Sequence, residues 1–445
     1  MIILWTDALI YLLVTALTVV GFVISRQPQM RRPLKKIGAS KTGMVSLLIL
    51  VFFVIIGLLD SVHFKSKDTR THEIISLLDY WAKPLRERDE KTYSAPFATH
   101  LYSKEAITLD NGSTQWGNPR LKYGGSHLQN PEAERRVDIL GKAVVGFSKG
   151  AGLMVLVLIV VWGALHKKHK PLLTHSSSKA LFLVMFLLIS IAYMLIDLSA
   201  YYHVFGTDKV GEDVFYQAIK SIRTGLVIGS LTTMIMLPLA IIFGIMAGFF
   251  RGWVDDVIQY VYTTLNSIPS VLLIAASILM VQVYMSNHAE EFNSLIVRSD
   301  MRLLFLCLIL GVTSWTGLCR MLRAETLKLR EMEYVQAAQA LGVRRWVILI
   351  RHILPNVMHI VLISVVLDFS GLVLAEAVLS YINIGVDPTT YSWGNMINGA
   401  RLEMARDPVV WWSLLASFVF MFSLVLAANL FADTVRNAFD PRRAE

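Results

Sequence analysis

The chain has 445 residues, of which 55% are hydrophobic and only 17% are charged. Ordinary soluble domains carry about 25% charged residues, so this composition excludes disordered, collagen-like and disulfide-built proteins and argues strongly against a soluble enzyme. The formal net charge is +9, but the positive residues stand beside apolar segments, which favours an effect on membrane topology over a nucleic-acid partner. Together these features predict an all-α polytopic membrane protein.

Nine segments are apolar over enough residues to cross a bilayer as helices, because a hydrocarbon core of about 30 Å needs about 20 helical residues. In chain order they lie at roughly 3–25, 43–63, 148–165, 180–202, 222–250, 256–285, 301–320, 357–380 and 411–432. The first lacks the basic start and the cleavage pattern of a signal peptide, so we predict that it stays as a span. Lys and Arg gather in the loops after the first, third and seventh segments, which predicts an outer N-terminus and an inner C-terminus.

Residues 64–147 form the one long polar stretch, and we expect them on the outer face. An amphipathic pattern at 74–81 predicts a short helix there, and Asn111-Gly112 and Gly124-Gly125 predict turns. The pattern does not decide between a small outer domain and a loop that lies over the spans.

The chain carries no recognisable motif of covalent chemistry. Its one Gly-Lys pair, Gly141-Lys142, is followed by Ala143 and is therefore not a phosphate-binding loop. The histidines at 166–175 lack the Cys/His spacing of a tetrahedral metal site, so we interpret them as solvated side chains near a membrane end. We predict no catalytic residue, no metal site and no cofactor on this chain.

The inner loop after the seventh segment carries the strongest signal. Residues 320–341 are rich in good helix formers, Gly342 suits the left-handed backbone that ends a helix, and a second helix is expected to begin near Arg344. Pro355 predicts a kink where the chain re-enters the membrane. The pattern predicts a helix–turn–helix on the cytoplasmic face, with three alanines that give one side little bulk for entry into another protein's groove. These are Ala337, Ala338 and Ala340.

This loop resembles the EAA loop of ABC importer permeases, whose pattern is Glu-Ala-Ala, three residues, Gly, nine residues and then Ile-x-Leu-Pro. Gln336 replaces the leading Glu of that pattern, and His352 replaces its Ile. The resemblance implies that the loop is the coupling helix that docks into a cytoplasmic ATPase. The residues assigned to coupling are Glu333, Tyr334, Gln336, Ala337, Ala338, Gly342, Arg344, Arg345, Leu354 and Pro355.

A second motif narrows the resemblance. Residues 205–213 resemble the GTD..GRD box of dipeptide, oligopeptide and nickel permeases, with Glu212 in place of Arg and Val204 where Pro is common. Two acids on one short loop are few for a metal site, so we favour a role in holding the outer loop or in meeting a solute-binding protein. The matching residues of the box are Gly206, Thr207, Asp208, Gly211 and Asp213.

The motifs together cover roughly 200–443 and resemble the second, C-type permease subunit, which implies a type I (MetI-like) importer core. Residues 93–97 resemble the stretch that precedes the box in this family, and on that interpretation the third and fourth spans are inserted between the two. We therefore expect three parts. They are an N-terminal extension at 1–203 with about four spans and the outer region at 64–147, the importer transmembrane domain at 204–433, and a cytoplasmic tail at 434–445.

Two acids lie within the eighth apolar segment. Asp368 stands near its middle, where a charge costs at least about 2.5 kcal/mol and normally faces a cavity or a partner. It is either a pathway acid that attracts a cationic peptide amino terminus or one member of a structural pair. Glu376, nearer the outer end, is the second pathway candidate, although we favour a structural cap or a loop pairing for it. Asp197 is similar in position.

The resemblance implies a permease subunit of an ATP-driven importer in the bacterial inner membrane, with dipeptides or oligopeptides as the expected cargo and nickel or antimicrobial peptides as alternatives. The implied partners are a second permease in a heterodimer, two cytoplasmic ABC ATPase subunits that bind ATP and Mg²⁺, a periplasmic solute-binding protein and membrane lipid. On the residues alone, two other classes stay open. One is an ion-driven carrier that uses Asp368, Glu376 and Asp197, and the other is a non-transporting scaffold.

Overall fold

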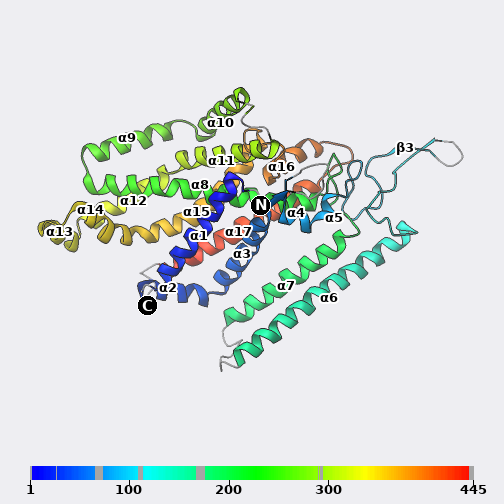
Figure 1. Ribbon diagram of the computed structural model, residues 1–445, viewed down its shortest axis with the longest axis horizontal. Helices are drawn as coiled ribbons and strands as arrows, with labels where there is room; N and C mark the ends of the chain where they lie inside the picture. Colours follow the sequence, from blue (N-terminus) through cyan, green and yellow to red (C-terminus); the bar gives the residue numbers. More distant parts are fainter. Residues whose placement is uncertain are drawn as a thin grey trace. The chain divides into compact units, whose positions relative to one another are not determined.

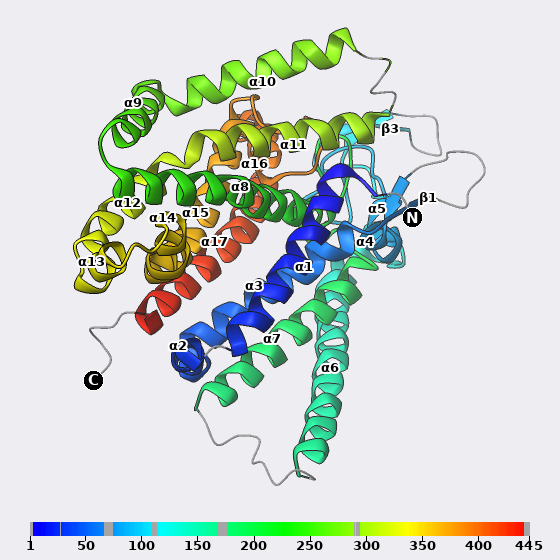
Figure 2. The same ribbon diagram turned by 60° about the vertical axis from the view of Figure 1, so that its left-hand side comes forward.

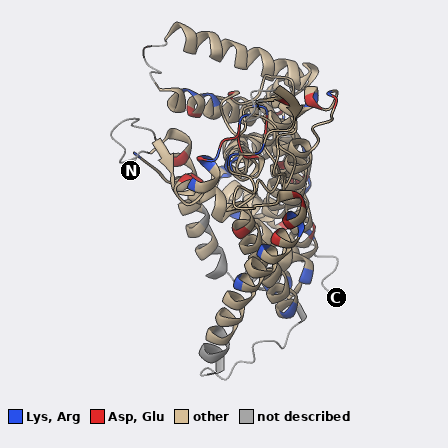
Figure 3. Cartoon of the chain, turned by 90° about the vertical axis from the view of Figure 1, so that its right-hand side faces the viewer, with Lys and Arg blue, Asp and Glu red and all other residues tan. Residues whose placement is uncertain are grey.

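The computed structural model of the chain describes residues 3–26, 28–65, 74–108, 114–166, 176–288, 290 and 294–439. Its elements are almost all helices, as the composition predicts (Figure 1). The predicted turn at Asn111-Gly112, most of the histidine cluster and residues 440–445 of the predicted tail lie outside the described residues. Most of the ribbon carries no charge, and the charged residues occur in short stretches (Figure 3).

The chain folds into two compact units, the first of which contains Gly38–Thr224 and Tyr391–Ala427. Its long helices are α3 (Lys41–Asp60), α6 (Pro131–His166), α7 (Ser176–Ser199), the start of α8 (Val214–Phe250) and most of α17 (Trp412–Phe439). Its short elements are β1 (His63–Lys65), β2 (Ile74–Ser76), α4 (Leu77–Trp81), α5 (Lys83–Arg86), β3 (Glu105–Thr108), β4 (Thr114–Gly117) and α16 (Trp393–Glu403).

The outer region of this unit is built from two small antiparallel hairpins and two short helices. β1 pairs with β2, and β3 pairs with β4. The predicted helix at 74–81 begins later than expected, because 74–76 form a strand and Ser76 caps the helix that follows. The Ser76 hydroxyl accepts the backbone N–H of Asp79 at 3.0 Å, and the Asp79 carboxylate accepts the N–H of Ser76 at 2.9 Å, which is a complete capping box.

Helices α6 and α7 form an antiparallel pair in the first unit (Figures 1 and 2). Two glycines of α6 allow the close approach. A Cβ atom added at Gly146 would lie 2.8 Å from the Cα of Met194, and one at Gly150 would lie 2.6 Å from the Cα of Ser190. Small residues four apart are the usual means by which membrane helices pack backbone against backbone. Helix α7 also packs against α3.

The second unit contains Ile3–Ile37, Gly225–Thr390 and Ala428–Glu445. Among the described residues it also holds most of α8, the end of α17 and the following helices. They are α1 (Trp5–Arg26), α2 (Pro28–Ala39, up to Ile37), α9 (Trp253–Ser267), α10 (Ser270–Asn287), α11 (Leu295–Ser314), α12 (Thr316–Arg330), α13 (Glu333–Ala340), α14 (Arg345–Ile348), the π-helical turn η2 (Leu349–Ile353) and α15 (Leu354–Tyr381).

The core of the second unit lies where α8, α12, α13 and α15 meet. Gly244 and Gly248 of α8 face α12, and a Cβ atom at these positions would lie 2.8 Å from the carbonyl oxygen of Cys319 and 2.6 Å from the Cβ of Thr326. Small residues four apart allow this close packing of one helix against another. Because α12 carries the loop to α13, this packing fixes one end of the hairpin that α12, α13 and α14 form.

Seven helices of the described residues are long and apolar enough to cross a membrane, where the sequence predicted nine spans. The predicted sixth span at 256–285 is wrong as a single helix. It is two helices, α9 and α10, and only α10 qualifies as a span (Figure 2). Pro269 explains the break, since the residue before a proline is pushed out of the helical region, and Ile268 has an extended backbone with φ −90° and ψ 130°.

The first and seventh predicted spans also differ from expectation. The first coincides with α1, in which the apolar helix among the described residues is Trp5–Ala16 and is too short to count. The seventh, at 301–320, falls on α11 and α12 and does not qualify among the described residues, because Arg298, Asp300 and Arg302 interrupt the apolar run. Asp300 is buried and accepts a hydrogen bond from the backbone N–H of Thr6 at 3.2 Å.

The compact units do not coincide with the predicted division into extension, importer domain and tail. Residues 204–224 and 391–427 fold with the N-terminal region, while residues 3–37 fold with the region that carries the cytoplasmic hairpin. These units describe packing, so the predicted domain boundaries stay a prediction.

Candidate functional site

The hairpin that the sequence predicts on the cytoplasmic face consists of α12, α13 and α14. Residues 320–341, expected as one helix, form two helices, α12 and α13, which are separated at Glu331 and Met332, and the second predicted helix is α14. Gly342 has φ +72°, the left-handed conformation expected at the turn. Its N–H donates to the carbonyl of Gln339 at 3.0 Å, and the N–H of Val343 donates to the carbonyl of Ala338 at 3.1 Å. These bonds close the end of α13, and the chain enters α14 two residues later.

Helix α13 has one face in the core and one face in solvent. Val335 is fully buried and Ala338 is 8% exposed, and both belong to the core cluster that includes Ile348. The expectation that Ala338 lies on the unbulky outer side is therefore wrong. Val335 and Ala338 are three residues apart and share the inner face of the helix. The exposed face is formed by Glu333, Tyr334, Gln336, Ala337, Gln339, Ala340 and Leu341.

The hairpin is tied to its neighbours by polar contacts as well. The side chain of Asn356 donates to the Tyr334 hydroxyl at 3.1 Å, which links α13 to the start of α15. Arg323 of α12 forms two hydrogen bonds with Asp255 of α9 at 2.6 and 2.7 Å, and these bonds hold the pKa of the Asp255 carboxyl below its usual value. Two parallel charged hydrogen bonds fix the orientation of the two side chains as well as the distance between them, so they hold α12 against α9 at the start of the hairpin.

The region around Pro355 adapts without a sharp break. Proline lacks an N–H and its ring crowds the carbonyl four residues earlier, and here the turn just before it, Leu349–Ile353, is π-helical. Leu354 and Pro355 open α15, and the whole stretch Arg345–Tyr381 runs as one apolar helical segment. The predicted kink is thus a π-helical turn, through which the hairpin connects directly to a span.

The box at 205–213 is a turn whose acids are used within the turn itself. Asp208 accepts the backbone N–H groups of Val210 and Glu212, each at 3.0 Å. Asp213 accepts the N–H groups of Phe215 and Tyr216 at 2.9 and 3.2 Å, which caps the start of α8. The geometry therefore favours a structural role for both carboxylates. Gly206 and Gly211, at φ +70° and +86°, allow the sharp turns on either side.

The structure brings residues 93–97 against this box. The backbone N–H of Ser94 donates to the Thr207 hydroxyl at 2.7 Å, and the N–H of Thr207 donates to the carbonyl of Ser94 at 3.1 Å. The N–H of Phe97 donates to the carbonyl of His203 at 2.9 Å. The two ends of the intervening segment, 98–202, therefore lie close together, as the ends of an inserted segment must.

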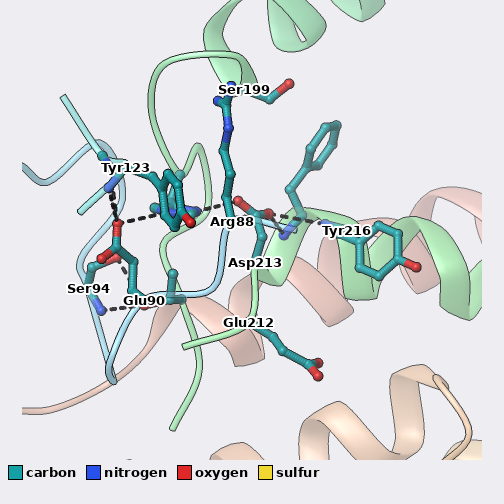
Figure 4. Close-up of polar contacts among 12 residues, drawn as sticks. Arg88, Glu90, Ser94, Tyr123, Ser199, Glu212, Asp213 and Tyr216 are labelled. Atoms are coloured by element: carbon teal, nitrogen blue, oxygen red, sulfur yellow. Dashed lines mark hydrogen bonds and ion pairs between the residues drawn. The ribbon is translucent and has the colours of Figure 1, made fainter. Parts of the chain in front are cut away.

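A buried histidine at this junction was missed by the sequence analysis. His203 lies between two buried carboxylates, with Nδ1 2.7 Å from Asp213 and Nε2 3.4 Å from Glu90. Glu90 also accepts the backbone N–H groups of Lys122, Tyr123 and Gly124 at 2.8 to 3.1 Å. Figure 4 shows Glu90 and Asp213 on two separate segments of the chain. The only sequence signal was a histidine two residues before the box.

The electrostatics of this cluster favour the charged forms of His203 and Glu90. Burial alone would lower the pKa of His203, but the hydrogen bonds and charges of Asp213 and Glu90 raise it to about 9. Burial would raise the pKa of Glu90, but hydrogen bonds from His203 and from the three backbone N–H groups lower it to about 2. An imidazolium held between two carboxylates therefore joins the segment around Glu90 to the turn that starts α8.

A second buried charge cluster lies close by in the same unit. Lys220 Nζ is 2.6 Å from Asp60 and 2.9 Å from Asp79, and the Tyr216 hydroxyl donates to Asp79 at 2.7 Å. Burial would raise the pKa of Asp79, but the charge of Lys220 and the surrounding hydrogen bonds lower it to about 2. The cluster joins the end of α3, the capped helix α4 and the start of α8, so it fixes the outer ends of two spans.

The two acids of the eighth apolar segment lie on α15 in different surroundings. Glu376 is 1% exposed and accepts a hydrogen bond from the Ser380 hydroxyl at 2.7 Å. Asp368 is half-buried and has no hydrogen bond or ion pair with the part of the chain that the structure describes. It borders an exposed face that includes Leu367 and Leu374. No hydrogen bond or ion pair joins Asp368 to the described residues of the hairpin.

Asp197, the acid of similar position, lies 2.6 Å from Lys149 of α6. This ion pair joins α6 and α7. It is a contact of the α6–α7 pair.

Sequence comparisons place the chain among transport proteins. The profile of the family described as binding-protein-dependent transport system inner membrane component matches residues 240–445. A dipeptide transport system permease protein of Lactococcus lactis is 30% identical over 243 residues, which is 55% of this chain and 65% of that protein. Oligopeptide transport system permease proteins of Haemophilus influenzae and Mycobacterium bovis are each 30% identical, over 54% of this chain and 71% and 76% of their own lengths.

Among solved structures, a methionine ABC transporter in inward-facing form overlaps 48% of this chain and 93% of its own chain, at 16% identity and a TM-score of 0.33, which is too loose to bear on the fold. The matched region of the family profile contains the hairpin, Asp368 and Glu376. Because relatives that are 30% identical to this chain match it over more than two thirds of their own length, the chain belongs to the family of binding-protein-dependent transport system inner membrane components.

Proposed function

We propose that this chain is the permease subunit of an ATP-driven peptide importer and forms half of its translocation pathway. The relatives named for dipeptide and oligopeptide transport support a peptide cargo. The proposed partners are a second permease, two cytoplasmic ATPase subunits that bind ATP and Mg²⁺, and a solute-binding protein on the outer face.

The observation that carries the proposal is the hairpin. Its inner face is fixed in the core by Val335 and Ala338, while Gln336, Ala337 and Leu341 stand free on the other side. A motor can shift a permease between two states only through contacts that differ between those states. A rigid, exposed helix that continues into a span through η2 is suited to carry such a shift from the cytoplasm into the membrane.

In the mechanism, ATP binding closes the partner ATPases, and α13 moves with the surface on which it docks. The movement passes through α14 and η2 to α15, so the spans rock and the pathway opens outward. The solute-binding protein then releases the peptide. This chain supplies the docking helix and the pathway wall, and the partner ATPases carry out the hydrolysis.

The test is a matched pair of tryptophan substitutions in the full complex reconstituted into vesicles. Ala337→Trp places a bulky side chain on the exposed face of α13 and is expected to lower ATPase co-purification and peptide-stimulated ATP hydrolysis at least tenfold. Ala405→Trp, at an exposed alanine just beyond α16, is the control and should keep both. Wild-type coupling in Ala337→Trp, or uptake driven by an ion gradient in ATP-free vesicles, would overturn the proposal.

A further inference from the structure

A cavity of about 350 Å³ lies beside the hairpin in the second unit. This size falls within the usual range of small-ligand sites, about 300 to 1,000 Å³. It lies between the last residues of α8, the last residue of α12 and the turn that joins α13 to α14. Its lining residues are Phe249, Phe250, Arg330, Gln339, Val343 and Arg345.

The polar side of the cavity is positively charged. Arg330 donates one N–H to the carbonyl of Phe249 at 2.9 Å, which leaves other donors of its guanidinium for a ligand. Arg345 has no ion pair with any described residue, and no acid is found among the described lining residues. The nearby carboxylate of Glu331 is already paired with Arg251 at 2.6 Å. Two guanidinium groups without a carboxylate repel each other, and an anion between them would relieve that repulsion.

The other lining residues are mostly apolar, and they indicate the level of the membrane at which the cavity lies. Phe249 and Phe250 are the last residues of α8, and Arg251 follows directly. The ring of Phe250 contacts that of Trp346 at a centroid distance of 5.9 Å, and Trp346 is 60% exposed. Exposed aromatic rings beside basic residues at the end of a span are typical of the level of the lipid headgroups.

We propose that this cavity binds the phosphate of an anionic phospholipid from the inner leaflet. The guanidinium groups of Arg330 and Arg345 hold the phosphate oxygens, the Gln339 amide donates a further hydrogen bond, and the glycerol end of the lipid lies against Phe249 and Val343. Arginine suits this role because its planar fork matches phosphate geometry. A soluble phosphate has the same chemistry but gains nothing from the apolar wall.

The position of the site gives binding a consequence for the hairpin. Gln339 precedes the Gly342 turn, and Val343 and Arg345 follow it, so a bound lipid touches both arms of the hairpin. The lipid would hold the turn against the end of α8. This effect on coupling rests on the proposed function, whereas lipid binding itself does not.

The test measures lipid binding to the full-length chain purified without partner ATPases, by native mass spectrometry. Phosphatidylglycerol, phosphatidylcholine and inorganic phosphate are titrated in parallel against wild type, Arg345→Gln and Arg351→Gln. Arg351 is an exposed arginine of η2 that does not line the cavity, so it is the matched control.

We expect wild type to prefer phosphatidylglycerol and Arg345→Gln to bind it at least about fivefold more weakly, the effect of one charge at a headgroup. Arg351→Gln should bind as wild type. Equal losses in both variants, or equal affinity for phosphatidylcholine, would contradict the site. Inorganic phosphate binding as tightly as the lipid would overturn the assignment to a phospholipid. Because no ATPase is present, each result is independent of the proposed transport function.

Discussion

Asp368 and Glu376 lie two turns apart on α15, and their surroundings separate them. The Glu376 carboxylate is buried and bonded to Ser380, while Asp368 is half-buried beside an exposed apolar face and has no partner in the described part of the chain. A carboxylate in a span is costly unless it meets a partner or a cavity. We therefore expect Asp368 to meet a group that the isolated chain does not contain, such as a cationic peptide terminus.

Removing the charge of Asp368 should change cargo preference. Asp368→Asn is expected to lower the uptake of cationic peptides several-fold relative to neutral peptides of equal length, because an amide attracts a cation less strongly than a carboxylate does. The measurement is competition uptake in vesicles with the complete complex. Glu376→Gln is the control and should lower thermal stability without changing the cationic-to-neutral ratio. An unchanged ratio in Asp368→Asn would count against a role in the pathway.

The His203 cluster predicts a pH-dependent stability of the outer region. The pKa of His203 is raised from 6.5 to about 9, so its stabilising effect is complete below pH 6.5 and disappears as the pH rises through 9. The shift corresponds to on the order of 3 kcal/mol. The buried carboxylates of Glu90 and Asp213 face the ring from two segments, and Asp89 adds a further negative charge nearby.

Hydrogen exchange of the outer region between pH 6.5 and 10 measures this effect. Wild type should lose protection of residues 90–95 and 203–213 as the pH rises, after correction for the intrinsic exchange rate. His203→Gln should be less protected at pH 7 and should show almost no further loss. A parallel fall in both proteins would show that other groups control the transition.

Among the elements, the hairpin depends on the backbone of one residue. Gly342 has φ +72°, which costs an ordinary residue roughly 1 to 2 kcal/mol and which proline cannot adopt. Gly342→Pro is therefore expected to abolish ATPase binding and transport while membrane insertion continues. Gly342→Asn is the control, because asparagine tolerates this conformation, and it should retain most of the activity.

Co-purification of the ATPases with each variant is the measurement. Normal binding by Gly342→Pro would mean that the turn between α13 and α14 has no part in docking.

The sequence predicted elements best where the signal is local. The hairpin follows from a run of helix formers and a glycine at the turn, both read within about 25 residues. Which side of α13 is exposed could not be predicted in the same way. Three alanines look alike in the sequence, and only the packing of Val335 and Ala338 against Ile348 shows which of them is buried.

The same limit explains the errors in the spans. A window of hydropathy joins α9 and α10 because both are apolar, although Pro269 separates them. It also accepts 301–320, although Arg298 and Asp300 lie just before this segment and Arg302 lies within it. Breaks of one or two residues matter for geometry but change average hydropathy very little.

At the scale of the whole molecule, the family assignment rests on about half of the chain. The relatives match 54–55% of its length, and the family profile begins at residue 240. Contacts between distant segments leave no local pattern in the sequence. Ser94 and Thr207 are 113 residues apart and bond directly, and only the resemblance of residues 93–97 to the stretch before the box indicated that they are neighbours.

The hydrogen bond from Phe97 to His203 has a practical consequence for engineering. This bond brings together the two ends of segment 98–202. A foreign folded domain whose termini lie close together, such as a fluorescent reporter, could therefore replace this segment without stretching the backbone on either side.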